Sequence, residues 1–450
     1  MCGIFGIFNH PEASNHAYLG LYALQHRGQE SCGIVSSDGN QLFHHRQMGL
    51  VSEAFTQDIL KRLSGTSAIG HVRYSTAGSS ELKNAQPFVV DYAKGGVAIA
   101  HNGNLVNAPL LRSDLESLGS IFQSSMDTEV IVHLIARSRE KMFISRTIQA
   151  LKQVEGAYSL LFLTEREMVA ARDPLGFRPL VLGRLKNAPV IASETCALDL
   201  IGAQFLREIE PGEIILINED GIRSYKPFPS RQPHQCVFEF IYFARPDSFI
   251  FKRNVYQARK GLGAELAREA PADADMVVPI PDSGFPATLG YAAESKIPLE
   301  LGMIRNHYVG RTFIEPEQRI RHFGVKIKLN PVKGLMEGKR VVTVDDSIVR
   351  ATTSRKINKM FRAAGAKEVH FRISSPPMTH PCFFGIDTPK RSELIASSHQ
   401  IKGIQKFIKA TSLSYLSLEG LKKCMGEDAE KFCYACFTGD YPIPFEMELD

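Results

Sequence analysis

Residues 341–354 read Val-Val-Thr-Val-Asp-Asp-Ser-Ile-Val-Arg-Ala-Thr-Thr-Ser, and they decide the fold of the chain's second half. The first four are apolar or β-branched and predict a buried strand, while helical spacing begins at Ser354. The polar loop between them lies at the carboxyl end of a strand, where open α/β sheets bind ligands. The following helix N-terminus offers backbone N–H groups to a phosphate. The loop is no Walker A motif, because it lacks the Gly-Lys-Ser/Thr element.

The alternation of strand and helix extends around this stretch. Residues 276–280 read as a buried strand and residues 287–295 as a helix, and the pattern repeats at 341–344 and 354–364. Such alternation predicts a parallel-sheet α/β domain.

The first half of the chain reads differently. Short β-rich segments are separated by Gly, Asn and Ser turns, and a helical pattern follows Asp127, which together predict a mixed α+β domain. Prolines and polar residues cluster at 226–233, where periodicity is lost and a linker is expected. Because 450 residues exceed what one core usually organises, we expect two domains, residues 2–230 and 231–450.

Bulk composition restricts the function without identifying it. The chain is 44% hydrophobic and 22% charged, like ordinary soluble globular proteins, and no apolar run approaches the ~20 residues of a spanning helix. The net charge of +5 is spread out, with no Lys/Arg block that would track nucleic acid. The N-terminal sequence lacks the pattern of a secretory or organellar leader. We expect a cytoplasmic protein that binds neither nucleic acid nor membrane.

The eight cysteines do not predict a disulfide framework, because a reducing compartment would not maintain one. Cys433 and Cys436 form a CxxC pair. Its spacing alone fits a redox pair, half of a zinc site or half of an iron-sulfur site.

Cys2 carries both a thiol and a free α-amine if an aminopeptidase removes Met1. An α-amine and a thiol have similar reference pKa values, near ~8 and ~8.5, so the amine can take the thiol proton. N-terminal nucleophiles use this pairing where other enzymes need a histidine. By position alone, a small buried core residue is the commoner outcome for such a cysteine.

Five ordered segments argue for the nucleophile. They are 2–6 (CGIFG), 24–30 (LQHRGQE), 70–76 (GHVRYST), 101–105 (HNGNL) and 125–129 (SMDTE). In order and approximate spacing they resemble the class II, N-terminal-nucleophile glutamine amidotransferases. That resemblance implies an αββα sandwich for the first domain, with Cys2 attacking the side-chain amide of glutamine.

The same resemblance assigns four further residues around the glutamine. Arg73 would pair with the α-carboxylate and Asp127 with the α-ammonium, roles that suit a guanidinium fork and a carboxylate. Asn102 and the backbone N–H of Gly103 would form the oxyanion hole. Taken singly, the three motifs could equally be a solvated arginine, a helix cap and an Asn-Gly turn.

Residues 341–354 resemble the signature of type I phosphoribosyltransferases, which bind phosphoribosyl pyrophosphate (PRPP). The resemblance implies that Asp345 and Asp346 hold the ribose hydroxyls and Mg²⁺. The residues expected at the 5-phosphate are Ser347, Arg350, Ala351, Thr352 and Thr353. Ala351 stands where relatives commonly carry Gly, so a slight constraint on the backbone is expected there. The alternative is a plain strand-to-helix turn with an Asp cap.

Two further segments resemble parts of the same fold. Residues 279–284 (PIPDSG) resemble its pyrophosphate loop, which implies that Ser283 approaches the metal. Residues 305–313, with Tyr308 and Arg311, resemble its flexible PRPP lid, whose cations face the pyrophosphate. A charged solvated loop is the alternative for this second segment.

Both halves, with residues 238–248 (FEFIYFARPDS) between them, resemble the amidophosphoribosyltransferases over essentially the whole chain. The resemblance implies that ammonia freed at Cys2 displaces pyrophosphate from PRPP, giving 5-phosphoribosylamine in the first step of purine synthesis. It also implies purine nucleotide inhibitors and a homotetramer. The alternatives are another class II glutamine amidotransferase, which needs a different second domain, and a non-catalytic PRPP- or nucleotide-sensing regulator.

One branch of that family carries a [4Fe-4S] cluster on four cysteines, and this chain has cysteines in the matching contexts. The matching positions are Cys236, Cys382, Cys433 and Cys436. The resemblance therefore implies a cluster of structural or oxygen-sensing use, with zinc and unligated thiols as alternatives. Cys424 lies outside the pattern, and we expect Cys32 and Cys196 in the core.

Overall fold

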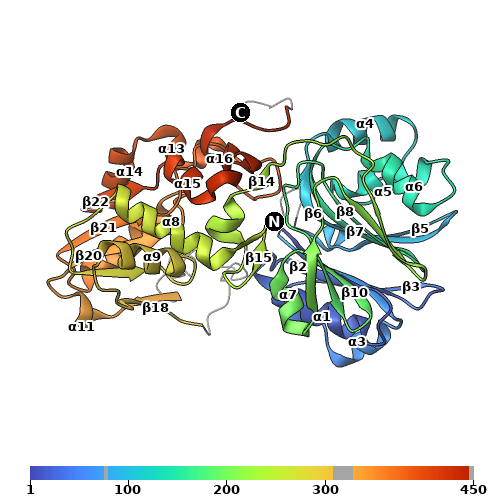
Figure 1. The fold of residues 1–450 in the computed structure, drawn as a ribbon, viewed down its shortest axis with the longest axis horizontal. Helices are drawn as coiled ribbons and strands as arrows, with labels where there is room; N and C mark the ends of the chain where they lie inside the picture. Colours follow the sequence, from blue (N-terminus) through green and yellow to red (C-terminus); the bar gives the residue numbers. More distant parts are fainter. Residues whose placement is uncertain (75–79, 308–327, 445–450) are drawn as a thin grey trace.

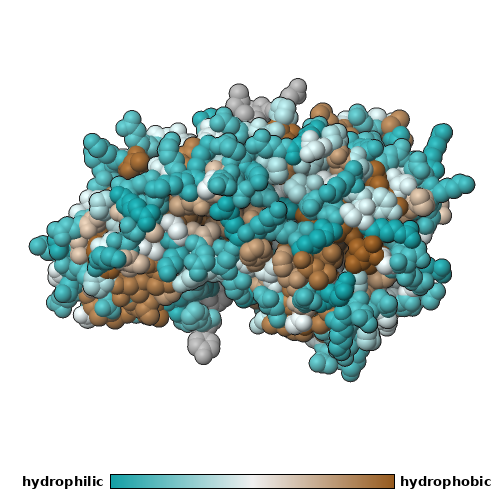
Figure 2. Space-filling model, viewed as in Figure 1, coloured by the Kyte–Doolittle hydropathy of each residue, from teal (hydrophilic) through white to brown (hydrophobic). Residues whose placement is uncertain are grey.

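Two lobes lie side by side in the computed structural model, which describes residues 1–74, 80–307 and 328–444 (Figure 1). The N-terminus lies at the junction between them. Figure 2 shows hydrophilic side chains over much of the viewed face. An apolar area lies at the lower left, over β18 (Met303–Arg305) and α11 (Lys333–Met336), and Leu301 and Ile304 are exposed. Within the described residues no helix is both long and apolar enough to cross a bilayer.

The first lobe is built on two antiparallel sheets. The larger sheet has the order β11 (Gln204–Glu208), β9 (Val181–Leu185), β10 (Ala188–Ala192), β1 (Gly3–Ile7), β4 (Ser67–Arg73), β2 (Ser31–Ser37) and β3 (Leu42–Met48). The smaller has the order β13 (Gly221–Tyr225), β12 (Ile214–Asn218), β8 (Met168–Arg172), β7 (Gly156–Leu163), β6 (Gly95–Leu105) and β5 (Phe88–Tyr92).

Three apolar layers hold this lobe together. Residues such as Ile4, Ile69 and Leu161 pack between the two sheets, and each is fully buried. The outer face of the larger sheet is covered by α1 (Ala13–Ala23) and α7 (Thr195–Ile201). The outer face of the smaller is covered by α4 (Ala108–Ser117), α5 (Thr128–Arg137) and α6 (Phe143–Leu151). Because each sheet is covered on both faces, central strands such as β4 and β7 are buried at every residue, whereas the edge strands β3, β11 and β13 are more exposed. Short α2 (Val51–Ala54) and α3 (Gln57–Arg62) lie at the edge formed by β2 and β3.

The second lobe contains a parallel sheet between helices. Its order is β17 (Met276–Pro279), β20 (Arg340–Asp345), β21 (Glu368–Ile373) and β22 (Ser412–Tyr415). Val342 faces α8 (Val255–Glu269) and α9 (Phe285–Ser295), whereas Val341 faces α12 (Thr352–Ala363) and α14 (Ile401–Ile408). This alternation is the period of two that a strand imposes. The expected αββα sandwich followed by a parallel-sheet α/β domain is therefore confirmed, although α12 begins at Thr352, two residues before the predicted start.

Short elements complete the second half of the chain. They are β14 (Gln235–Cys236), a π-helical turn η3 (Glu239–Phe243), β15 (Phe249–Ile250), β16 (Arg253–Asn254), β18 (Met303–Arg305), β19 (Leu329–Pro331), α11 (Lys333–Met336), α13 (Ile395–Ser398), α15 (Leu418–Met425), β23 (Phe432–Cys433) and α16 (Ala435–Thr438). Strand β14 pairs in parallel with β23, which joins the segment between the lobes to the C-terminal region.

Candidate active sites

Cys2 lies directly before β1, at the junction of the lobes, and is 6% exposed. Its backbone N–H donates to Oδ1 of Asn102 over 3.2 Å. Its thiol donates to the carbonyl oxygen of Tyr74 over 3.6 Å. Nε of Arg27 donates to the carbonyl oxygen of Cys2 over 2.9 Å, which ties the chain end to the turn of residues 25–27.

Asn102 presents a buried amide beside Cys2. Its Oδ1 accepts the Cys2 N–H, whereas its Nδ2 is buried and has no hydrogen-bond partner among the residues that the structure describes. A buried donor without a partner is costly and calls for an explanation. A negatively charged oxygen forming near Cys2 would supply the missing acceptor. Next to it, Gly103 approaches β7 so closely that a Cβ would lie 1.9 Å from the carbonyl oxygen of Ala157.

Arg73 is the last residue of β4 and is 3% exposed. Its Nη1 lies 4.0 Å from Oε2 of Glu30. A Cβ on Gly28 would lie 2.5 Å from the carbonyl carbon of Arg73, so a glycine at position 28 allows this close backbone packing. Strand β4 thus ends at Arg73, the predicted partner of the glutamine α-carboxylate. The next residue, Tyr74, has the carbonyl oxygen that accepts from the Cys2 thiol.

Asp127 caps α5, and its carboxylate also reaches β6. Oδ1 accepts from the Thr128 N–H over 2.8 Å, and Oδ2 accepts from the Leu105 N–H over 2.9 Å. Oδ2 also lies 3.7 Å from Nδ1 of His101. Burial alone would raise the pKa of Asp127, but His101 and the backbone donors lower it below its usual value. The group is therefore a carboxylate, as the binding of an ammonium requires.

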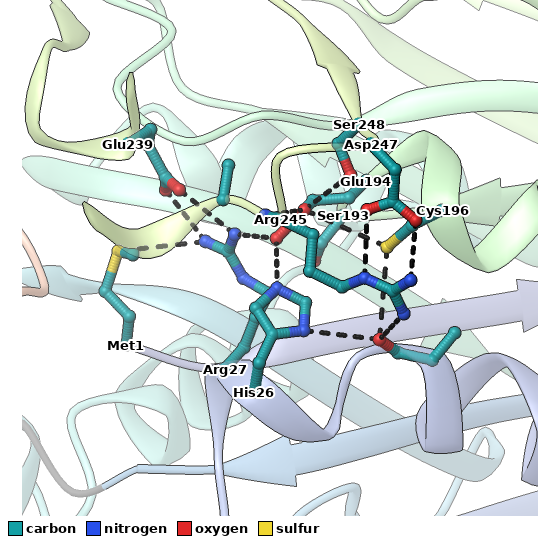
Figure 3. Close-up of polar contacts among 12 residues, drawn as sticks. Met1, His26, Arg27, Ser193, Glu194, Cys196, Glu239, Arg245, Asp247 and Ser248 are labelled. Carbon is teal, nitrogen blue, oxygen red and sulfur yellow. Dashed lines mark hydrogen bonds and ion pairs between the residues drawn. The ribbon is translucent and has the colours of Figure 1, made fainter. Parts of the chain in front are cut away.

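Met1 is fully buried between the lobes. Its sulfur accepts from Nη1 of Arg178 over 2.6 Å, and it also contacts Arg27 (Figure 3). Burial lowers the pKa of the Met1 α-amine to about 6. Loss of Met1 would leave the amine of Cys2 in a similarly buried place beside Asn102, where the neutral form is favoured.

A cavity of about 530 Å³ opens at the carboxyl end of β20, and we call it the Asp345 cavity. Its lining includes Tyr74, Phe238, Tyr242, Ser283, residues 345–354 and Asp387. Burial raises the pKa of both Asp345 and Asp346, and in Asp345 the neighbouring carboxyl raises it further. A hydrogen bond from Ser283 to Asp346 opposes this effect, so the structure brings these three predicted residues together.

The loop after Asp346 lines the same cavity. The hydroxyl of Ser347 donates to Oδ1 of Asp346 over 2.6 Å. Ala351 has φ +57°, a left-handed conformation, and Thr352 and Thr353 open α12. Arg350 also lines the cavity, and its Nε donates to Oε2 of Glu393 over 2.9 Å.

The remaining predicted PRPP residues, Tyr308 and Arg311, lie outside the described residues.

The four predicted cluster cysteines line one small cavity, which we call the cysteine cavity. Cys236 and Cys433 face each other across the β14–β23 pair. All eight cysteines are free, Cys32 and Cys196 are buried in the first lobe as expected, and Cys424 does not line this cavity. Within the described residues, no group of three or more His, Cys, Asp or Glu side chains is arranged to hold a metal ion.

A buried ion cluster joins the lobes beside Met1 (Figure 3). Arg27 donates to Glu239 from Nη2 over 2.7 Å and from Nη1 over 3.0 Å, and Nη1 also contacts Glu194. All three side chains are fully buried. Burial alone would raise the pKa of Glu194, but His26 and Arg27 hold it well below its usual range.

Sequence reasoning missed this cluster and the role of Tyr74 as a wall of the Asp345 cavity. Arg27, Tyr74 and Glu239 all lie within quoted motif segments, so the motifs marked the right regions. Arg27 and Glu239 are 212 residues apart, however, and no local pattern predicts which distant charges pair.

Comparisons with known proteins found a matching family model and relatives that cover the whole chain. A family model described as a glutamine amidotransferase domain matches residues 71–200. The chain is 55% identical over 451 residues to "Amidophosphoribosyltransferase 1, chloroplastic" of Arabidopsis thaliana, which covers 100% of this chain and 80% of that protein. It is 52% identical over 446 residues to the amidophosphoribosyltransferase of Bacillus subtilis (strain 168), covering 98% and 94%.

Two solved structures resemble the whole chain. One is described as the allosteric regulatory enzyme of purine biosynthesis, with a TM-score of 0.95 and 51% identity over 99% of this chain and 97% of that one. The other is glutamine PRPP amidotransferase from B. subtilis complexed with ADP and GMP, with a TM-score of 0.94 and 51% identity over 99% and 98%.

Proposed function

The chain belongs to the amidophosphoribosyltransferase family, and we propose that its two sites perform the two halves of the family's reaction. The reaction converts PRPP, glutamine and water into 5-phosphoribosylamine, glutamate and pyrophosphate. The Cys2 site would hydrolyse glutamine, and the Asp345 cavity would bind PRPP. The chain is therefore an enzyme of the first step of purine biosynthesis. What remains to be tested is which residues carry each half.

The position of Tyr74 is the observation that carries this assignment. Its carbonyl oxygen accepts from the Cys2 thiol, and the same residue lines the Asp345 cavity. The nucleophile of one site is thus hydrogen-bonded to a residue that lines the other site. This neighbourhood of the two sites supports a direct transfer of ammonia from Cys2 to the Asp345 cavity, where it would act as a neutral nucleophile.

Hydrolysis of glutamine begins with transfer of the Cys2 thiol proton to its own α-amine, once Met1 is gone. The thiolate attacks the side-chain amide carbon, and the carbonyl oxygen becomes an anion facing Nδ2 of Asn102 and the N–H of Gly103. Collapse of this intermediate breaks the C–N bond, and the protonated amine gives its proton to the leaving ammonia. Water then cleaves the thioester to release glutamate. Arg73 and Asp127 hold the two ends of the substrate.

In the second half, ammonia attacks C1 of PRPP and pyrophosphate leaves. Asp345 and Asp346 suit the ribose hydroxyls and Mg²⁺, because two buried neighbouring carboxylates are costly to ionise unless a cation joins them. Two carboxylates plus substrate oxygens are a usual Mg²⁺ ligand set, and Ser283 lies beside them. When bound, Mg²⁺ supplies charge that neutralises the departing pyrophosphate. Residues 347–353 would bind the 5-phosphate.

The cysteine cavity is proposed to hold a [4Fe-4S] cluster. The supporting observation is that four cysteines line one cavity. Among the described residues, no three His, Cys, Asp or Glu side chains are arranged to hold a single metal ion. In a cluster each cysteine binds a different iron, so convergence on one point is not needed. Iron and sulfide analysis with visible spectra of anaerobically purified protein tests this. Metal-free protein, or zinc in place of iron, would reject it.

Three further properties are proposed for this chain. The B. subtilis structure contains ADP and GMP, which supports purine nucleotide inhibitors for this chain. A homotetramer is the oligomeric state to test by light scattering. Eight free cysteines suit a reducing compartment such as the cytoplasm, although several plant relatives are chloroplastic.

Two variants separate the halves of the reaction. Cys2→Ala should abolish glutamine-dependent pyrophosphate release and keep ammonia-dependent release, whereas Asp346→Asn should lose both and keep glutamate release from glutamine. Cys424→Ala, outside both sites, is the matched control. Glutamine-dependent activity retained by Cys2→Ala would refute the assignment of the nucleophile.

The state of the N-terminus is a separate test. Intact mass of the active enzyme should show a chain that begins at Cys2. Met1 retained on protein with full glutamine-dependent activity would refute the α-amine as base.

A further inference from the structure

Residues 382–389 (CFFGIDTP), which we call segment 382–389, touch all three sites. Cys382 lines the cysteine cavity, Ile386 lines both this cavity and the Asp345 cavity, and residues 387–389 line the Asp345 cavity. The residues between them pack against the oxyanion-hole region of the first lobe. The segment has no regular secondary structure, so its side contacts set its path.

Two contacts join the segment to the strand that carries Asn102. Nδ2 of Asn104 donates to the carbonyl oxygen of Phe383 over 2.9 Å. Gly385, at φ +101°, lies so close to Gly103 that a Cβ would be 3.0 Å from its Cα and carbonyl carbon. On its other side Gly103 meets Ala157, where a Cβ on Gly103 would lie 1.9 Å from the carbonyl oxygen. The backbone of Gly103 is therefore held between β7 and the second lobe.

The segment is itself fixed in place. The ring of Phe384 stacks on Phe177 of the first lobe, with centroids 4.3 Å apart and an interplanar angle of 19°. Nε of Arg178 donates to the carbonyl oxygen of Phe384 over 2.9 Å. Within the segment, the N–H of Cys382 donates to Oγ1 of Thr388 over 2.7 Å. Phe384 is 2% exposed, so this side of the contact is a packed wall.

We propose that segment 382–389 positions the oxyanion hole, so that the second lobe supplies one wall of the glutamine site. This inference rests on the proposed roles of Cys2 and Gly103. The physical reason is that the Gly385–Gly103 contact is backbone on backbone, with no flexible side chain to absorb a displacement. A shift of a few tenths of an ångström in Gly385 must move the Gly103 N–H relative to the oxygen it stabilises. Donor placement of this kind affects the transition state more than the bound substrate.

Gly385→Ala is the primary test, and Gly221→Ala is its matched control. Both glycines have similar positive φ values, +101° and +111°, but a Cβ on Gly221 meets nothing within 4 Å. The strain of a left-handed alanine is thus common to both variants, and only Gly385→Ala presses on Gly103. We expect kcat for glutamine hydrolysis to fall roughly 10- to 100-fold in Gly385→Ala with little change in KM. Gly221→Ala should stay within twofold of the parent.

Three further measurements separate positioning from a general structural defect. Ammonia-dependent synthesis should stay within twofold of the parent in Asn104→Ala, because Asn104 does not line the Asp345 cavity. The Cys2 thiol adds to the C=O of an aldehyde analogue of glutamine and forms a hemithioacetal. The oxygen of this adduct lies in the oxyanion hole. The affinity of the analogue should fall by about the same factor as kcat. Asn104→Ala, which removes only the bond to Phe383, should lower kcat about 10-fold by the same route.

The outcomes are separable from those of the proposed function. Unchanged kcat in both Gly385→Ala and Asn104→Ala, or a loss expressed only in KM, would overturn the positioning role. If Gly385→Ala does not fold, Asn104→Ala and the aldehyde analogue decide alone. Absence of glutamate release by the parent enzyme would instead refute the glutaminase assignment on which the inference rests.

Discussion

The amide oxygen and the amide nitrogen of Asn102 have different roles. Oδ1 faces the N–H of Cys2, which becomes an amine after Met1 is removed, while Nδ2 is left for the developing oxyanion. The orientation is internally consistent, because the reverse amide assignment would place two donors against each other. A single side chain thus links the base and the electrostatic stabilisation of the reaction.

Substitution of Asn102 by Ala should lower kcat for glutamine hydrolysis by about 10²- to 10³-fold, since one oxyanion donor is lost. Ammonia-dependent synthesis should persist, because the Asp345 cavity is unchanged. Steady-state assays with each nitrogen donor measure both effects, and Asn107→Ala, which alters hydrogen bonds at the start of α4, is the control. Equal loss with both donors would contradict the assignment.

The α-amine leads to a pH prediction. Burial lowers the pKa of the N-terminal amine of the Met1-bearing chain to about 6, and the amine of Cys2 would be similarly buried. The neutral amine is the base, so burial should keep glutamate release constant down to a pH below the ~8 of an exposed amine, with a decline at lower pH. The profile is measured as kcat/KM without PRPP. A decline centred near pH ~8 would indicate an ordinary, exposed amine.

At the scale of elements, the junction of β20 and α12 shows how a strand and helix present a loop. Ala351 adopts φ +57° directly before α12, so the position that the sequence marked as unusual is a left-handed one. For a residue with a Cβ this conformation costs about 1–2 kcal/mol, whereas glycine adopts it without that cost. The alanine at position 351, where relatives commonly carry glycine, therefore strains the backbone in the proposed 5-phosphate loop.

Ala351→Gly should stabilise the second lobe by about 1 kcal/mol, because relief of strain exceeds the extra entropy of glycine in the unfolded chain. The midpoint of urea unfolding followed by a second-lobe probe should rise. Gly338→Ala makes the opposite exchange at φ +71° in open space and should be destabilising by a similar amount. A lower midpoint for Ala351→Gly would show that the methyl group packs usefully.

At the scale of the whole molecule, the two lobes are joined by charges as well as by apolar contacts. Arg27 belongs to the first lobe and Glu239 to the segment that leads into the second, and both are fully buried. Such a pair stabilises the junction only while both partners are present, because a lone buried charge is expensive. The N-terminus lies beside this cluster, so domain docking and active-site geometry depend on the same residues.

Arg27→Met should destabilise the docked enzyme by about 3–5 kcal/mol, since it leaves Glu239 buried without its main partner. The thermal midpoint should fall by several degrees and glutaminase activity should fall with it. Lys226→Met provides the comparison, because the Lys226–Glu210 pair is more than half exposed and should contribute less than about 1 kcal/mol. Equal effects of the two substitutions would mean that the buried pair contributes no more than a surface pair.

Sequence by itself determined the local chemistry of this protein. The apolar run 341–344 followed by paired acids predicted a strand and its ligand loop, and the structure has β20 and the Asp345 cavity there. The five ordered motifs likewise placed Cys2, Asn102 and Asp127 in a sandwich that the structure confirms. These features are readable because strand period, helix capping and motif spacing are properties of neighbouring residues.

Only the tertiary structure decided which distant residues meet. Arg27 pairs with Glu239, Tyr74 forms a wall between the two sites, and Gly385 packs on Gly103. Each contact joins segments that no local pattern relates, and each depends on the tertiary packing of the two lobes. The physical reason is that burial of charge and close approach of backbone are set by three-dimensional packing, to which residues far apart in the chain contribute together.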